Sequence, residues 1–176
     1  MQVPGTAAVT GRLTTRTGTP VAGAAVEIQQ FTGSVWRTVT TATTGGDGTF
    51  SATLAPSANG LLRAHFPGDS DRFQTASRRA SLRVRPEMEL SVPDTHVARG
   101  ALVKVSGTIK PAKGRVTVVV LSGKRRVASF RVSPRRGSYT KHLKLKKPGL
   151  YRVYGAFAGD SRNVPGASRA VFVRVR

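Results

Sequence analysis

The chain has 176 residues, no cysteine and a formal net charge of +21, from 29 Lys and Arg against 8 Asp and Glu. Without cysteine it forms no disulfide and has no thiol chemistry, and it holds no apolar run near the roughly 18 residues that a membrane-spanning helix needs. Abundant Val and Thr, interrupted by 19 Gly and 10 Pro, indicate strands and turns rather than helices.

The chain starts Met1-Gln2-Val3-Pro4-Gly5. This stretch has neither the basic region nor the apolar region of a signal peptide. We therefore interpret Met1 as a start residue added to a fragment of a longer polypeptide.

Through the first half of the chain, apolar residues alternate with polar ones, which predicts strands with one buried face. Trp36 falls on one of these strands, and Gly45-Gly46-Asp47-Gly48 predicts a tight hairpin turn. The residues predicted to face inward are Ala7, Val9, Gly11, Leu13, Val26, Ile28, Leu62, Ala64, Phe66, Ala80, Leu82 and Val84.

The second half shows the same alternation after a first predicted strand over Glu89 to Val92, with a turn predicted at Ser133 to Gly137. Lys141 falls at an inward position of its strand, while His142, Lys144 and Lys146 do not follow that parity, so the register there stays open. The inward residues are Val103, Val105, Gly107, Ile109, Val116, Val118, Val120, Val153, Gly155, Phe157, Val171, Val173 and Val175.

The two halves are copies of one pattern. Phe66-Pro67-Gly68-Asp69-Ser70 returns 91 residues later as Phe157-Ala158-Gly159-Asp160-Ser161, and both copies continue with Ala-Ser-Arg and end in Arg-Val-Arg. Upstream matches keep the offset between 89 and 96 residues, so the copies differ in loop length. We expect a first module over residues 1–86 and a second over residues 87–176, because Pro86 cannot continue a strand ladder.

This pattern predicts an all-β chain with two tandem immunoglobulin-like antiparallel β-sandwiches and almost no helix. The first module has little room before Val9 for a strand like Glu89 to Val92. The sequence leaves open whether that strand is trimmed or whether the module borrows an edge from a neighbour.

The repeated Phe, Gly-Asp and Ala-Ser-Arg positions resemble bacterial Ig-like repeat domains. The first module is also similar to carboxypeptidase-regulatory-like modules, through Gly18 to Val26 and Asp47-Gly48-Thr49-Phe50. These resemblances cover nearly the whole chain. They imply a stalk, spacer or adhesive appendage of a secreted or cell-surface bacterial protein, beside other domains of the parent protein.

Catalytic and metal-binding patterns are absent from the sequence. His65, His96 and His142 occupy unrelated places in the repeat, and Glu27 has no acidic partner for glycoside hydrolysis. No serine lies in a nucleophile elbow, and no glycine loop suits a phosphate. We expect no enzymatic activity, no cofactor and no metal.

The repeated acid at Asp69 and Asp160 has two interpretations. A calcium site would need several converging oxygens, but Arg162 stands where the first copy has Asp71. The favoured interpretation is that Asp69 and Asp160 accept backbone N–H bonds and so stabilise the turn.

The basic charge is concentrated in the second module. The first 86 residues hold 9 cations and 4 acids, and residues 87–176 hold 20 cations and 4 acids. This asymmetry indicates attraction to a polyanion, such as teichoic acid, acidic polysaccharide, anionic lipid or nucleic acid bound without sequence preference; the other interpretation is a surface that only aids solubility. The predicted polyanion-binding residues are Lys124, Arg125, Arg126, Arg135, Arg136, Lys144, Lys146 and Lys147.

Three functions therefore remain open from the sequence. The first is a non-catalytic structural or interaction module, and the second is a polyanion-binding module. The third is an accessory carbohydrate-binding part of an extracellular enzyme, with Trp36 as an exposed stacking platform; a half-buried packing role for Trp36 is favoured. Specific nucleic-acid recognition is not expected, because no recognition helix is predicted.

Overall fold

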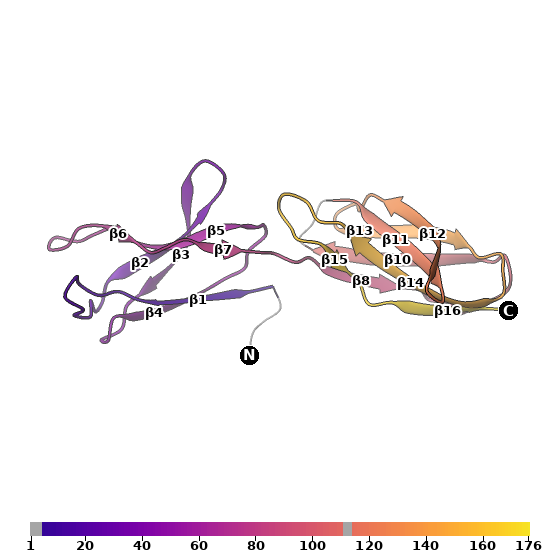
Figure 1. Cartoon of the computed structure of the whole chain (residues 1–176), viewed down its shortest axis with the longest axis horizontal. Helices are drawn as coiled ribbons and strands as arrows, with labels where there is room; N and C mark the ends of the chain where they lie inside the picture. The colour runs from indigo at the N-terminus through magenta and orange to yellow at the C-terminus, as the bar shows by residue number, and fades with distance from the viewer. Residues whose placement is uncertain (1–4, 111–113) are drawn as a thin grey trace. The chain divides into compact units, whose positions relative to one another are not determined.

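The computed structural model describes residues 5–110 and 114–176 (Figure 1). The interpretation of Met1 to Pro4 falls outside these residues. All regular elements in the described part of the chain are β-strands. The chain divides into two compact units, Met1–Arg83 and Val84–Arg176, which we call the first and the second unit.

The compact units divide three residues before the module limits expected from the repeat. Val84 is buried, and its carbonyl accepts a hydrogen bond from Val164 N–H over 2.9 Å. Pro86 is also buried and lies beside Gly166. Residues 1–86 and 87–176 stay a proposal for the repeated sequence modules.

The first unit consists of two sheets that share a core. A two-stranded sheet pairs β1 with β4, and the facing sheet has the order β3-β2-β5-β6, with β7 also paired to β5 (Figure 1). Val26, Ile28 and Leu62 from the larger sheet pack with Phe50 and Ala52 from the smaller one. The strands are β1 Ala7–Arg12, β2 Ala25–Phe31, β3 Trp36–Thr43, β4 Thr49–Leu54, β5 Gly60–Phe66, β6 Thr75–Ala76 and β7 Ala80–Leu82.

The second unit repeats this arrangement with one more strand in each sheet. Its smaller sheet has the order β13-β10-β8, and the facing sheet has the order β12-β11-β14-β16-β9, with β15 paired to β14. The core includes Val105, Val118, Val153 and Val173, all with no exposed surface. The strands are β8 Glu87–Ser91, β9 His96–Val97, β10 Leu102–Lys110, β11 Val116–Ser122, β12 Arg125–Val132, β13 Ser138–Lys144, β14 Gly149–Phe157, β15 Gly166–Ala167 and β16 Val171–Val175.

Each unit is thus an immunoglobulin-like sandwich, as predicted, although two sequence expectations were wrong in detail. The strand expected over Glu89 to Val92 begins at Glu87 and ends at Ser91. Ala80, expected to face the core, is exposed. Its strand β7 lies at the edge of the larger sheet, where the facing sheet has only two strands to cover it.

Side-chain hydrogen bonds confirm the repeat. The hydroxyl of Ser77 accepts the backbone N–H of Ala64 over 3.0 Å and donates to the carbonyl of Arg78. Ser168 makes the same two bonds with Gly155 and Arg169 in the second unit. The matched serine therefore joins the residue after the short strand, β6 or β15, to the neighbouring long strand, β5 or β14, in both units.

The turn interpretation of the repeated aspartate is confirmed. Asp69 Oδ1 accepts the N–H of Asp71 over 3.0 Å. Asp160 Oδ1 accepts the N–H groups of Arg162 and Asn163 over 2.8 and 2.7 Å. These are local Asx turns, which hold the backbone of the loop in both units.

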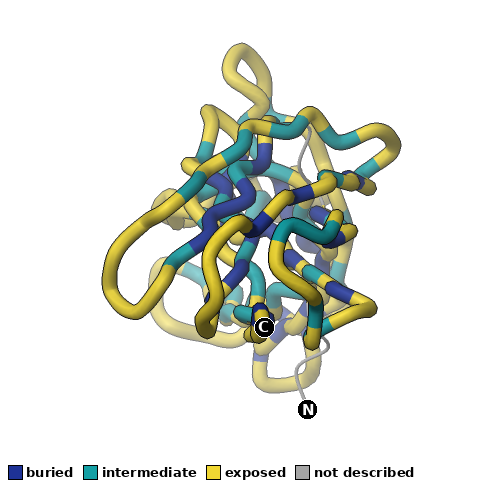
Figure 2. The backbone as a smooth tube through the Cα atoms, turned by 90° about the vertical axis from the view of Figure 1, so that its right-hand side faces the viewer, coloured by how far each residue is buried: buried dark blue, intermediate teal, exposed yellow. Residues whose placement is uncertain are grey.

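The two predicted hairpin turns have different backbone conformations. Gly48 has a φ of 78°, and an added Cβ there would collide with the carbonyl of Leu13. In the second unit Arg136 and Gly137 have φ values of 49° and 79°, between backbone partners Arg135 and Ser138. Positive φ at both central residues is the type I′ geometry that suits a two-residue hairpin. Gly45, Gly46 and Asp47 are exposed, as are Arg135 and Arg136, whereas Gly48 is buried. Figure 2 shows the backbone coloured by burial, with exposed residues in yellow.

The register of β13, left open by the sequence, follows simple alternation. Tyr139 and Leu143 are buried, and Lys141 between them is half-buried. The Lys141 ammonium lies 5.1 Å from the centre of the Phe130 ring, a cation–π contact. An inward-facing lysine is therefore accommodated at the edge of this sandwich by an aromatic partner.

Candidate anion-binding surface

The first group of predicted cations lies where β11 turns into β12. Gly123 has a φ of 56°, which allows a short turn that Lys124 completes. Arg125 and Arg126 are the first residues of β12 and pair with Ser122 and Leu121 of β11. All three cations are exposed, and the hairpin fixes their backbone.

The second group lies where β13 ends and the chain leads into β14. Leu143 and Leu145 are buried in the core, with 1% and 7% of their surface exposed. Because alternate residues of an extended chain face opposite sides, Lys144 and Lys146 are directed outward. Two buried leucines therefore hold the neighbouring lysines in solvent.

Three hydrogen bonds hold the backbone of this connection. Gly100 donates its N–H to the carbonyl of Leu145 over 2.8 Å. Arg99 Nε donates to the carbonyl of Lys146 over 2.9 Å, and the Tyr151 hydroxyl donates to that of Lys147 over 2.8 Å. The lysines consequently extend from a fixed loop. Less backbone conformational entropy is therefore lost when a ligand binds.

The two groups meet around an open hollow of about 400 Å³. Val127, Ala128, Leu145 and Tyr151 also line it. Five of the eight predicted residues line it: Arg125, Arg126, Lys144, Lys146 and Lys147.

Arg135 and Arg136 are not part of this hollow. They lie in the turn after β12, whereas Arg125 is at the start of that strand. At about 3.3 Å per residue, the length of β12 separates the two positions by roughly 23 Å. Of the eight predicted residues, five therefore line the hollow, Lys124 lies in the turn before Arg125 without lining it, and Arg135 and Arg136 form a distant pair.

The charge around the hollow has little internal compensation. Among the described residues, both ion pairs lie in the first unit, between His65 and Glu27 and between Arg72 and Asp69. No acid occurs in the sequence between Asp94 and Asp160. The hollow is therefore a region of positive potential lined by solvent-exposed cations.

Two residues of this surface could not be found by sequence patterns. Arg99 adds a cation beside the Lys146 carbonyl, and Tyr151 lines the hollow. Arg99 is 47 residues away from Lys146 in sequence. Only the folded sheet brings such distant positions together.

Trp36 is half-buried on the outer face of the larger sheet in the first unit, as favoured from its strand position. The Arg63 guanidinium lies over its ring at 4.3 Å from the centroid, and the Phe31 ring lies 5.4 Å away. Arg63 Nε also donates to Gln29 Oε1 over 2.8 Å. A stacked arginine occupies the indole surface that a sugar ring would need.

Glu27 and His65 form a hydrogen-bonded pair on the same sheet, 2.9 Å apart between Oε2 and Nδ1. This bond to His65 holds the pKa of Glu27 below its ordinary value, with a further bond from Gln29. Within the described residues, no three His, Asp or Glu side chains converge as metal ligands would. Glu27 and His65 lie opposite each other in the ladder between β2 and β5, so their bond is a contact between these two strands.

Comparison with solved structures finds similarities at low sequence identity. An ICAM-5 D1–D4 ectodomain fragment matches all of this chain at 14% identity and a TM-score of 0.48, and the chain spans about half (52%) of that fragment. Fibronectin(III)-like modules of Clostridium thermocellum CbhA match 97% of the chain and 84% of their own at 15% identity and a TM-score of 0.36. The D0–D1 domain of intimin matches 96% of the chain and 90% of its own at 15% identity and a TM-score of 0.37.

No family model matches the sequence, and no curated protein matches it. No helix of the described residues could cross a membrane.

Proposed function

We propose that this protein is a non-catalytic interaction module whose second unit binds an anionic polymer. The observation that carries the proposal is the convergence of five cations, from β12, from the end of β13 and from the connection after it, around one hollow. A polymer with regularly spaced phosphates or carboxylates, such as teichoic acid, acidic polysaccharide or nucleic acid, offers matching charges. Binding would depend on charge and spacing, not on base sequence.

The setting that suits this activity is the outside of a bacterial cell. A secreted or surface-attached protein meets anionic envelope polymers directly, and sandwich modules of this kind commonly carry other domains. This localisation is part of the proposal and follows from the resemblance to bacterial Ig-like repeats.

A structural role as a spacer is the second candidate. It is supported by the separate apolar core of each unit, since such modules fold independently of a ligand. The carbohydrate-binding candidate has less support, because Arg63 covers Trp36.

A salt-titrated binding panel with heparin, wall teichoic acid and duplex DNA tests the proposal. The test variant is Arg125→Glu with Arg126→Glu, and the matched control is Arg135→Glu with Arg136→Glu, which changes the net charge equally. We expect the first variant to reduce the slope of log K against log salt by about 2, at roughly 0.9 per lost phosphate contact on duplex DNA. The control should retain most of the wild-type affinity.

Equal losses for the two variants would show that total charge alone attracts the polymer, and the hollow would not be a site. If the wild type binds none of the three polymers at physiological salt, polyanion binding is wrong and the spacer role is the better account.

A further inference from the structure

The outer face of the larger sheet in the second unit carries aromatic rings and arginines side by side. Arg152 and Tyr154 lie two residues apart on β14 and share this face, because Val153 between them is buried in the core. The Arg152 guanidinium lies 5.4 Å from the centre of the Tyr154 ring. Phe172 of β16 lies opposite Arg152 in the ladder. The arginine therefore has one ring beside it along its own strand and another on the neighbouring strand.

The Phe172 side chain is open to solvent although it belongs to a strand. Its surface is 56% exposed, whereas the next residue, Val173, has no exposed surface. Phe172 takes part in none of the ring–ring or cation–π contacts of the described residues. Leu150, which is 50% exposed, lies diagonally across from it on β14. Exposed apolar side chains gathered on one rigid face indicate an interaction surface.

The arginines of this face have no acid in their sheet. Arg174 lies two residues after Phe172 on β16, and Arg131 of β12 lies opposite Thr117, which belongs to the same face. None of the strands of this sheet, β9, β11, β12, β14, β15 and β16, contains Asp or Glu. Neither ion pair of the described residues includes Arg131, Arg152 or Arg174. The face therefore attracts anions and repels a second copy of itself.

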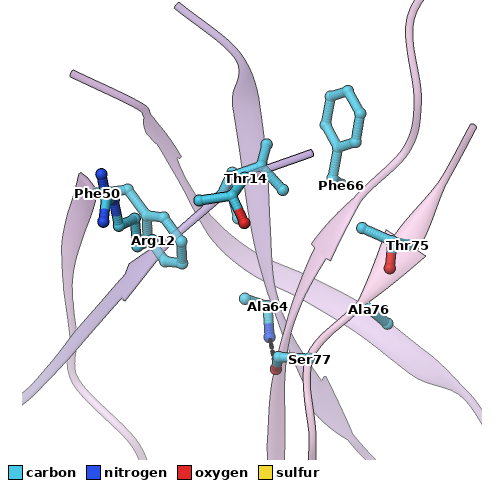
Figure 3. Close-up of a pocket in the computed structure, with 10 residues that line it drawn as sticks. Arg12, Thr14, Phe50, Ala64, Phe66, Thr75, Ala76 and Ser77 are labelled. Carbon is cyan, nitrogen blue, oxygen red and sulfur yellow. Dashed lines mark hydrogen bonds between the residues drawn. The ribbon is translucent and has the colours of Figure 1, made fainter. Parts of the chain in front are cut away.

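The larger sheets of the two units can be matched residue by residue. Ala64 and Ser77 are joined by the hydrogen bond drawn in Figure 3. Gly155 and Ser168 are joined by the same bond and lie 91 residues later in the chain. With this offset, the place of Phe172 is taken by Ser81. The first unit therefore has no ring at the equivalent position.

The same face of the first unit also holds an acid. Glu27 is bonded there to His65 and Gln29. Arg63 donates to Gln29 and lies over the Trp36 ring. The charged side chains of that face are thus bonded to one another. The duplicated units share a core pattern but differ on this outer face, which favours a function for it in the second unit alone.

Single-stranded nucleic acid has the chemistry that fits exposed rings among arginines. The flat face of an unpaired base stacks on an aromatic ring or on a guanidinium, and the phosphates pair with arginines. Tyr154 and Phe172 lie diagonally on adjacent strands, a spacing of about 7–8 Å that allows each ring its own base. Teichoic acid and acidic polysaccharide have no flat ring, and a duplex hides its base faces within the stack. The rings therefore favour a single strand over these other polyanions.

We propose that the outer face of the larger sheet in the second unit binds single-stranded nucleic acid. Bases stack on Phe172 and Tyr154, while Arg131, Arg152 and Arg174 pair with phosphates. Binding tolerates any sequence, since every base has a flat face. None of these five residues lines the hollow, so this surface adds a preference for unpaired bases to the attraction of anionic polymers there.

The probe is a fluorescein-labelled oligothymidylate of about 15 nucleotides, titrated with the full chain and compared with a duplex of the same length by fluorescence anisotropy. We expect the single strand to bind more tightly at equal salt. Charge alone would give the opposite order, because a duplex has the denser phosphate charge. Phe172→Ala should weaken the single strand about tenfold or more, the loss typical of one base-stacking ring, and should leave the duplex unchanged.

Phe73→Ala is the matched control, because Phe73 is 97% exposed in the first unit and the same atoms are removed without a change of charge. It should leave both affinities unchanged. Phe172→Tyr keeps the ring and should retain the affinity for the single strand, whereas Phe172→Leu should lose it. Arg174→Gln should reduce the slope of log K against log salt by about 0.7, the value for one phosphate contact on a single strand. Circular dichroism checks the fold of each variant.

Equal binding of the single strand and the duplex, or equal effects of Phe172→Ala and Phe73→Ala, refutes stacking on this face. Full binding by Phe172→Leu refutes it as well, because an apolar contact without a ring then suffices, as an acidic protein partner would make. A dimer in sedimentation velocity that Phe172→Ala dissociates makes a second copy the occupant and overturns the proposal. Failure of the hollow is a separate result, because it is measured by the Arg125→Glu, Arg126→Glu variant on heparin and duplex DNA, which Phe172→Ala should not affect.

Discussion

Gly155 and Tyr139 pack closely against each other, and the first unit has different residues at the two equivalent positions. A Cβ added to Gly155 would lie 2.5 Å from the Tyr139 hydroxyl oxygen and 3.5 Å from Tyr139 Cζ and from Met88 Cε. The hydroxyl is thus the atom that an alanine would collide with. In the first unit the equivalent residues are Ala64 and Phe50, an alanine beside an aromatic ring without a hydroxyl.

We therefore predict that Gly155→Ala destabilises the second unit by about 2 kcal/mol, as overpacking of a close-packed core commonly does. Tyr139→Phe should cost about 1 kcal/mol, because the hydroxyl donates to the Glu89 carbonyl over 3.0 Å. The double variant should cost only about 1 kcal/mol, since the remaining 3.5 Å contacts are ordinary. The coupling between the two substitutions is then about 2 kcal/mol.

Urea denaturation measures the four proteins, with each unit followed by its own chromophores. All three tyrosines, Tyr139, Tyr151 and Tyr154, belong to the second unit, and the single tryptophan, Trp36, belongs to the first. Tyrosine near-ultraviolet circular dichroism therefore reports the substituted unit. The Trp36 fluorescence midpoint is an internal control that should not move.

If the cost of the double variant equals the sum of the two single costs to within about 0.5 kcal/mol, the reasoning is refuted, because independent sites show no coupling. A shift of the Trp36 midpoint by the same amount would show that the substitutions act on more than the second unit.

Two further predictions concern the second unit. Burial raises the pKa of Tyr139 to about 12, so the folded state favours the neutral phenol. The contribution of this preference to the free energy of unfolding is complete below pH 10 and is lost as the pH rises through 12. In urea melts across that interval, the wild type should therefore lose about 2 kcal/mol more stability than Tyr139→Phe. Arg136 has a φ of 49°, in the left-handed region of backbone conformation, which costs a residue other than glycine about 1 kcal/mol. Arg136→Gly should therefore stabilise the second unit by about 0.5–1 kcal/mol, measured as a higher urea midpoint.

Each of these has a distinct contrary result. Parallel pH profiles for the wild type and Tyr139→Phe would mean that the phenol ionises equally well in the folded and unfolded chains. A lower midpoint for Arg136→Gly would mean that the arginine side chain makes a stabilising contact that outweighs the strain of its backbone.

The sequence alone predicted the strand alternation, the internal duplication and the all-β class. This succeeded because a strand buried on one face repeats every two residues, a period visible without knowledge of the partner strand. The turn role of Asp69 and Asp160 was predictable for a similar reason, since an Asx turn involves residues only two or three apart. Ala80 failed because its burial depends on the width of the facing sheet, which no local pattern encodes.

The grouping of the cations was decided by the tertiary structure. In sequence, Arg135 and Arg136 lie closer to Arg125 than Lys146 does, yet Lys146 lines the hollow with Arg125 and the two arginines do not. Strand β12 carries the chain away from the hollow, and β13 carries it back. The alternating pattern predicts which face of a strand turns inward, whereas the path of the backbone in space decides what covers that face and which side chains come together.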